Sequence, residues 1–168
     1  MTAVSPLLVA QITDTHLFAE VDRTWKGLST AYTLKAVLQR LQQIQPQPDV
    51  LLLTGDLSQD KTPESYELLI SLISPLNIPA YWIPGNHDNV SVMQQILDKP
   101  PISAEKSFHL GNWQFILLSS VEAGCDGGRL SPESLDWLDT ELQQTGDRPV
   151  MIALHIIHCR STVKSWMA

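Results

Sequence analysis

The sequence is poor in cysteine and has no long hydrophobic run. Its 168 residues include two cysteines, Cys125 and Cys159, which lack the close spacing of a zinc site, and we interpret both as free thiols. No apolar stretch approaches the roughly 20 residues that a membrane-spanning helix needs. Residues 1–6 also lack the basic start of a secretory signal. These absences argue against a disulfide-rich secreted domain and a membrane protein, so we expect a cytoplasmic location.

Positive charge is also scarce. The chain has 11 Lys and Arg against 18 Asp and Glu, a formal net charge of -7, which argues against a general binder of nucleic acid or anionic membranes. Hydrophobic residues make up 43% and charged residues 17%, the balance of a globular domain with one core. We find neither an internal repeat nor a linker. We therefore expect one domain, with neither nucleic acid nor a membrane as its partner, and the oligomeric state stays open.

Strand and helix patterns alternate in the first half of the chain. Runs of branched and aromatic residues at 7–13, 50–54 and 79–83 predict buried strands. Between these runs, apolar residues at helical spacing follow two N-cap residues, Ser29 and Thr62. Because a helix between successive strands favours parallel pairing, the sequence predicts an α/β fold with a parallel sheet.

The second half continues with elements of ordinary length. We predict a helix at 91–98, a hairpin of strands 107–110 and 113–119, a helix from Ser131-Pro132 to near Gly146, and a strand at 150–154. This last strand delivers His155. From Ile156 onward neither helical nor strand periodicity remains. We therefore take residues 1–155 as the domain and 156–168 as an aberrant tail.

Short motifs of acidic, amide and histidine residues directly follow three of the predicted strands. They are Asp14-Thr15-His16, Gly55-Asp56 and Gly85-Asn86-His87-Asp88. In open α/β sheets such strand ends share one edge, where ligands bind. Carboxylates forced together there would raise one another's pKa unless a cation lay between them. The motifs therefore predict a dinuclear metal site, at which Asp88 can fix the tautomer of His87.

Each motif also has a purely structural interpretation. Asp14 can cap a loop, and Gly55-Asp56 is a common turn sequence. Asn86 can occupy a positive-φ turn that leaves His87 exposed. The metal-site interpretation depends on the three motifs occurring together after three strands.

The motifs with their flanks, residues 11–18, 54–60 and 83–88, resemble those of the calcineurin-like metallophosphoesterases. Within that family they look most like the class III cyclic-nucleotide phosphodiesterases, and residues 128–138 also resemble that subgroup. The resemblance, from about Leu7 to His155, implies the N-terminal portion of a layered α/β/β/α sandwich. It further implies hydrolysis of a phosphodiester, most specifically 3′,5′-cyclic AMP to AMP, with another phosphoester substrate as the alternative.

The resemblance also implies a set of metal ligands. Asp14 and His16 would bind one ion, Asp56 would bridge two, Asn86 would bind the second, and His155 would be the next histidine of the site. Two divalent or mixed-valence ions about 3.5 to 4 Å apart would activate the attacking water. Oxygen and nitrogen ligands without thiolate suit manganese, iron or zinc.

His87 is implied to lie outside the ligand set. It would face the leaving group, oriented by Asp88 or Asp60, and protonate the departing ribose oxygen. The residues implied to contact the substrate are His16, Asp56, Asn86 and His87.

After His155 the chain departs from the family pattern. Family members continue with a proline-rich turn and later add a Gly-His-X-His motif, and this sequence has neither. Inserting one base after the codon of His155, with permitted codons, restores a histidine-proline turn. We therefore hypothesise that residues 156–168 are frameshifted, and we give His158 no ligand role. A non-catalytic remnant that binds metal or nucleotide weakly is the alternative. Without the rest of the family's sheet, apolar surface would be exposed, so we expect the chain to be poorly soluble or to associate.

Overall fold

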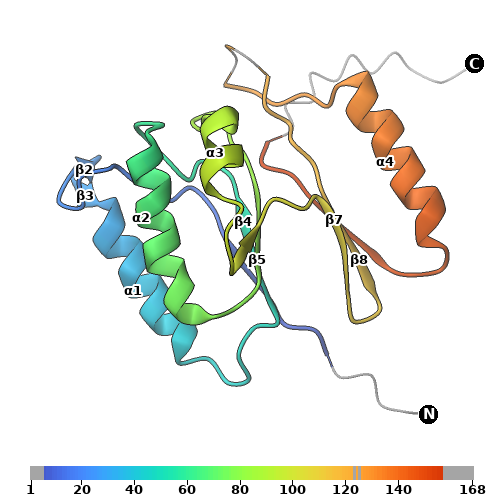
Figure 1. Ribbon diagram of the computed structural model, residues 1–168, viewed down its shortest axis with the longest axis horizontal. Helices are drawn as coiled ribbons and strands as arrows, with labels where there is room; N and C mark the ends of the chain where they lie inside the picture. Colours follow the sequence, from blue (N-terminus) through green and yellow to red (C-terminus); the bar gives the residue numbers. More distant parts are fainter. Residues whose placement is uncertain (1–5, 123, 125, 157–168) are drawn as a thin grey trace, which may run out of the picture.

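The computed structural model describes residues 6–122, 124 and 126–156. Cys125, Cys159, His158 and the rest of the tail from residue 157 lie outside the described residues. The chain forms two sheets flanked by helices (Figure 1). The first sheet is parallel, with the strand order β1-β4-β5-β6. Its strands are β1 (Val9–Ile12), β4 (Val50–Thr54), β5 (Ala80–Ile83) and β6 (Ile102–Ser103).

Helices connect the strands of this sheet in sequence. They are α1 (Thr30–Gln42), α2 (Pro63–Ile73) followed by the 3-10 turn η1 (Ser74–Leu76), and α3 (Val90–Ile96). The predicted caps are confirmed, since Ser29 accepts a hydrogen bond from the amide of Tyr32 and Thr62 accepts one from the amide of Ser65. The three helices lie on one side of the sheet (Figure 1). Their apolar faces and the sheet form the larger core, which includes the fully buried Leu69.

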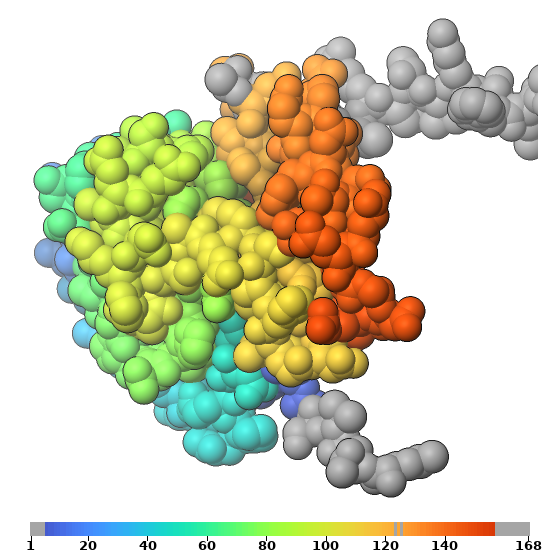
Figure 2. All heavy atoms as spheres, turned by 45° about the vertical axis from the view of Figure 1, so that its right-hand side comes forward, coloured from blue at the N-terminus to red at the C-terminus, as the bar shows by residue number. Residues whose placement is uncertain are grey.

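A second sheet packs on the opposite face. It consists of β7 (Ser107–Leu110), β8 (Trp113–Leu117) and β9 (Val150–Ala153), with β7 and β8 antiparallel and β8 and β9 parallel. Phe108 stacks on Tyr81 of β5, with ring centroids 3.5 Å apart, and so joins the two sheets. Helix α4 (Pro132–Thr145) lies alongside β7 and β8, away from α1 to α3 (Figures 1 and 2). The predicted α/β/β/α layering is therefore confirmed.

The segment between β1 and α1 differs from the prediction. We predicted no strand there, but the chain forms a hairpin of β2 (Thr24–Trp25) and β3 (Leu28–Ser29). Lys26 and Gly27 turn the hairpin with φ values of 51° and 82°, as a two-residue hairpin turn requires. The two-residue strand β6 was also missed, because so short a segment has no measurable periodicity. None of the helices in the described part of the chain has the length and apolar character that crossing a membrane requires.

Candidate metal centre

The loops after β1 and β4 stay paired beyond the ends of the two strands. The amide of Asp14 donates to the carbonyl of Gly55 at 3.0 Å, and the amide of His16 donates to the carbonyl of Asp56 at 2.9 Å. Asp14, His16 and Asp56 have φ values of 56°, 42° and 52°, a region that residues other than glycine rarely occupy. Such conformations cost on the order of 1–3 kcal/mol each and cluster at functional sites. This backbone brings the three side chains to one point.

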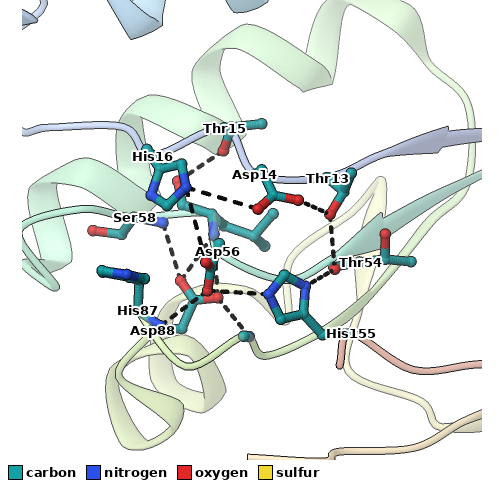
Figure 3. A network of polar contacts seen from close by, with 12 residues as sticks. Thr13, Asp14, Thr15, His16, Thr54, Asp56, Ser58, His87, Asp88 and His155 are labelled. Carbon is teal, nitrogen blue, oxygen red and sulfur yellow. Dashed lines mark hydrogen bonds and ion pairs between the residues drawn. The ribbon is translucent and has the colours of Figure 1, made fainter. Parts of the chain in front are cut away.

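The side chains of four predicted ligand residues meet there, as Figure 3 shows. Nε2 of His16 lies 3.8 Å from a carboxylate oxygen of Asp14 and 3.8 Å from one of Asp56. Nε2 of His155 lies 3.4 Å from the other oxygen of Asp56. One ligand atom from each of Asp14, Asp56 and His155 lies within 4.8 Å of the other two. Ligand atoms that each sit about 2.1 Å from one shared ion lie roughly 3–4 Å apart, so the spacing fits a metal ion.

His155 is held in the tautomer that a metal ligand needs. Its Nδ1 lies 2.7 Å from the carbonyl oxygen of Thr54. Because a carbonyl only accepts, Nδ1 carries the proton, and the lone pair of Nε2 faces Asp56. Gly55 makes this approach possible, since it has a φ of 92° and a Cβ at its position would lie 2.5 Å from Nδ1 of His155.

Two of the expected ligand atoms are buried without a hydrogen-bond partner. They are Oδ1 of Asn86 and Nε2 of His155, judged over the described residues. Buried polar atoms in native proteins are nearly always paired, so these two fit ligands of an ion. Burial lowers the pKa of His16 against the opposing charges of Asp56 and Asp14. This shift favours the neutral imidazole that coordinates metals.

Asn86 and His87 reach the site on the loop that follows β5. The amide of His87 donates to Oδ1 of Asp56 at 2.9 Å, which ties this loop to the predicted bridging carboxylate. The His87 ring stands edge-on to the His16 ring, with centroids 5.2 Å apart. His87 is half-buried beside the ligand cluster.

The predicted partner of His87 requires a correction. Within the described chain, the Asp88 carboxylate accepts hydrogen bonds from three backbone amides and one tyrosine hydroxyl rather than from His87. The Asp60 carboxylate accepts from Ala19, Ser58 and Thr62. Asp88 is buried, so its carboxylate needs donors on every side. Burial raises the pKa of Asp88, and the backbone hydrogen bonds oppose this shift. The structure therefore does not support Asp88 or Asp60 as the residue that orients His87.

Trp25 is a site residue that the sequence analysis missed. Its ring packs on His16 with centroids 4.0 Å apart, and Nζ of Lys26 lies 4.2 Å from the Trp25 centroid. The Lys26-Gly27 pair between the large apolar residues Trp25 and Leu28 was the signal for the hairpin that carries it. Thr54 was missed for another reason, since its carbonyl acts on His155 from 101 residues away.

A parallel sheet with carboxylates and imidazoles at its strand ends makes this an α/β domain with a candidate metal site. The chain belongs to the calcineurin-like phosphoesterase family, whose model matches residues 7–158. It is 49% identical over 150 residues to a 3′,5′-cyclic-nucleotide phosphodiesterase of Nostoc sp., covering 89% of this chain and 56% of the relative. It is 39% identical to the 3′,5′-cyclic adenosine monophosphate phosphodiesterase CpdA of Haemophilus influenzae, covering 94% and 57%. The chain thus spans a little over half the length of these relatives.

Proposed function

We propose that this chain is a metal-dependent phosphodiesterase that hydrolyses 3′,5′-cyclic nucleotides, with cyclic AMP as its main substrate. The observation that carries the proposal is the convergence of Asp14, Asp56 and His155 within 4.8 Å. The relatives from Nostoc sp. and Haemophilus influenzae are named as cyclic-nucleotide phosphodiesterases, which supports this choice of substrate.

The ligand residues can be assigned to two ions. Asp14 and His16 would hold the first ion, Asp56 would lie between both, and Asn86 would hold the second, with His155 completing the site beside Asp56. The oxygen and nitrogen donors suit manganese, iron or zinc. When bound, the ions lower the pKa of water and balance the charge that grows on the phosphate.

The protein contributes orientation and a proton. We assign His87 as the donor of a proton to the departing ribose oxygen, and its position outside the ligand cluster yet next to His16 supports this role. Its own amide donates a hydrogen bond to Asp56, which links the proposed proton donor to the proposed bridging carboxylate. We assign His16, Asp56, Asn86 and His87 as the residues that contact the phosphodiester, and we assign Asp88 a role in holding the loops rather than in proton transfer.

The proposal is tested by hydrolysis of cyclic AMP and of bis-p-nitrophenyl phosphate with added Mn²⁺. We expect metal-dependent turnover that falls by at least about a hundredfold in Asp56→Ala, since this carboxylate would serve both ions. Turnover that persists in Asp56→Ala, or that does not depend on metal, would refute the assignment.

A second candidate function is weak metal or nucleotide binding without catalysis. One observation favours it: the Asp14 side chain is 51% exposed, so the described residues leave the first ion open on that side. Mn²⁺ binding without hydrolysis of either substrate would support this candidate. The nucleotide sequence beyond codon 155 tests the frameshift hypothesis for residues 156–168, because an uninterrupted reading frame with no Gly-His-X-His motif in another frame would reject it.

A further inference from the structure

We propose that Tyr66 is a positioning residue of the metal centre. It acts through Asp88 to hold the loop that carries Asp56 against the loop that carries Asn86. The inference rests on the metal centre of the proposed function, and it assigns a role to a helix residue that lies outside all three sequence motifs.

Tyr66 contacts the Asn86 loop at two points. It is fully buried on α2, and its hydroxyl lies 3.0 Å from Oδ1 of Asp88. The amide of Asn89 donates to the same hydroxyl at 2.9 Å. Because an amide can only donate, the single hydroxyl proton is free to point at Asp88. Burial and the Asp88 charge both raise the pKa of Tyr66, so the hydroxyl remains a donor.

Asp88 in turn joins the two ligand loops. Its carboxylate accepts from the amides of Leu57 at 3.1 Å, Ser58 at 3.0 Å and Gly85 at 2.9 Å. Leu57 directly follows the predicted bridging ligand, and Gly85 directly precedes the predicted amide ligand. A single buried carboxylate therefore sets the spacing between the backbone segments next to two ligands.

The loops are in close contact at this point. A Cβ added at Gly85 would overlap the side chain and backbone of Asp56, so the position has no room for a side chain. Tyr66 links this junction to the core, because Leu69 and Ile73 on the same helix are fully buried against the first sheet. Its hydroxyl is thus the connection between a rigid helix and the carboxylate that spaces the two ligand loops.

Removing the hydroxyl in Tyr66→Phe tests this role. We expect the Kd for Mn²⁺ to rise roughly tenfold to a hundredfold, as is usual when a residue that orients ligands is lost. The Kd is measured by calorimetry or by the electron paramagnetic resonance signal of free Mn²⁺. The chain has three tyrosines, and Tyr32→Phe removes an exposed hydroxyl that bonds to Asp22, so its Kd should not change. Ile73→Val destabilises the same helix without touching the loops, and its Kd should not change either. An unchanged Kd in Tyr66→Phe, or an equal rise in Ile73→Val, would overturn the proposal.

Amide hydrogen exchange separates this inference from the proposed function. In Tyr66→Phe without metal, the amides of Leu57, Ser58 and Gly85 should exchange at least about tenfold faster, while the core of α1 keeps its protection. A wild-type chain that binds no Mn²⁺ would refute the metal centre, and the exchange data would still decide whether Tyr66 holds the loops. Exchange that is unchanged at these three amides, or faster throughout the chain, would overturn the role of Tyr66.

Discussion

At the scale of single residues, the orientation of His16 depends on a contact from outside its own motif. Nε2 of the imidazole lies 3.8 Å from carboxylates of both Asp14 and Asp56, while the ring packs against Trp25. Ring packing restricts rotation of a ligand and reduces the entropy lost when an ion binds. Trp25 therefore belongs to the site although it offers no ligand atom.

We predict that Trp25→Ala weakens metal binding by about tenfold, because His16 loses its packing partner and gains solvent. Since burial is the main cause of the lowered pKa of His16, the pKa should move up toward its ordinary value. Protons would then compete with metal at a higher pH than in the wild type. Calorimetry with Mn²⁺ and NMR titration of His16 measure the two effects. Trp113→Ala, on the second sheet, is the control, and equal affinities in both variants would contradict the prediction.

At the scale of elements, the site depends on how the loops after β1 and β4 leave their strands. Their continued backbone pairing places Asp14 and His16 beside Asp56. His155 follows β9 of the second sheet, and its ring is hydrogen-bonded to the carbonyl of Thr54 at the end of β4. The glycine that follows Thr54 has no room for a side chain, because the His155 ring and the backbone of Gly85 lie against it.

We predict that Gly55→Ala displaces His155 and abolishes tight metal binding. The variant combines an unfavourable φ of 92° with a Cβ only 2.5 Å from Nδ1 of His155. The free energy of unfolding should fall by about 1–3 kcal/mol in urea denaturation. Gly111→Ala is the matched control, because its φ is 58° but a Cβ there meets nothing within 4 Å. It should lose stability of similar size and keep its Mn²⁺ affinity; a parallel loss of affinity would point to strain alone.

At the scale of the whole molecule, a half-buried lysine, Lys106, lies where the two sheets are joined. Nζ of Lys106 donates to the Trp82 carbonyl at 2.5 Å and lies 3.3 Å from the centroid of the Trp82 ring. Burial lowers the pKa of Lys106 from 10.5 to about 7, against the opposing charge of Asp98. Between these two pKa values the unfolded chain binds more protons than the folded one, so stability rises with pH over this range.

We therefore predict that the Lys106 side chain adds about 2 kcal/mol to the free energy of unfolding between pH 7 and pH 9. The urea midpoint of the wild type should rise over this interval relative to that of Lys106→Met. The comparison cancels other titrating groups that the two chains share. Unfolding free energies that change in parallel with pH in the two proteins would show that Lys106 keeps its charge when folded.

Apolar side chains remain exposed on α4 and on the second sheet. Leu135 and Leu142 on α4 are 49% and 39% exposed, and Ile152 on β9 is 43% exposed. Such surface favours contacts between molecules, so we predict association at micromolar concentrations in analytical ultracentrifugation. A monomeric chain that melts cooperatively would contradict this prediction.

The sequence by itself determined the order of the elements and the position of the motifs. Local features can be recognised in a single sequence. They include helical periodicity, the residues adjacent to a strand end, and the helix caps at Ser29 and Thr62. The loops that carry Asp14, Asp56 and Asn86 were therefore predicted at the strand ends where the structure has them. Only the tertiary structure decided which groups hold them: Asp88 bonds to backbone amides and Tyr66 rather than to His87. The contacts of Asp88 with Leu57, Ser58 and Tyr66 join residues 22 to 31 positions apart, so they exist only once α2 has packed on the first sheet.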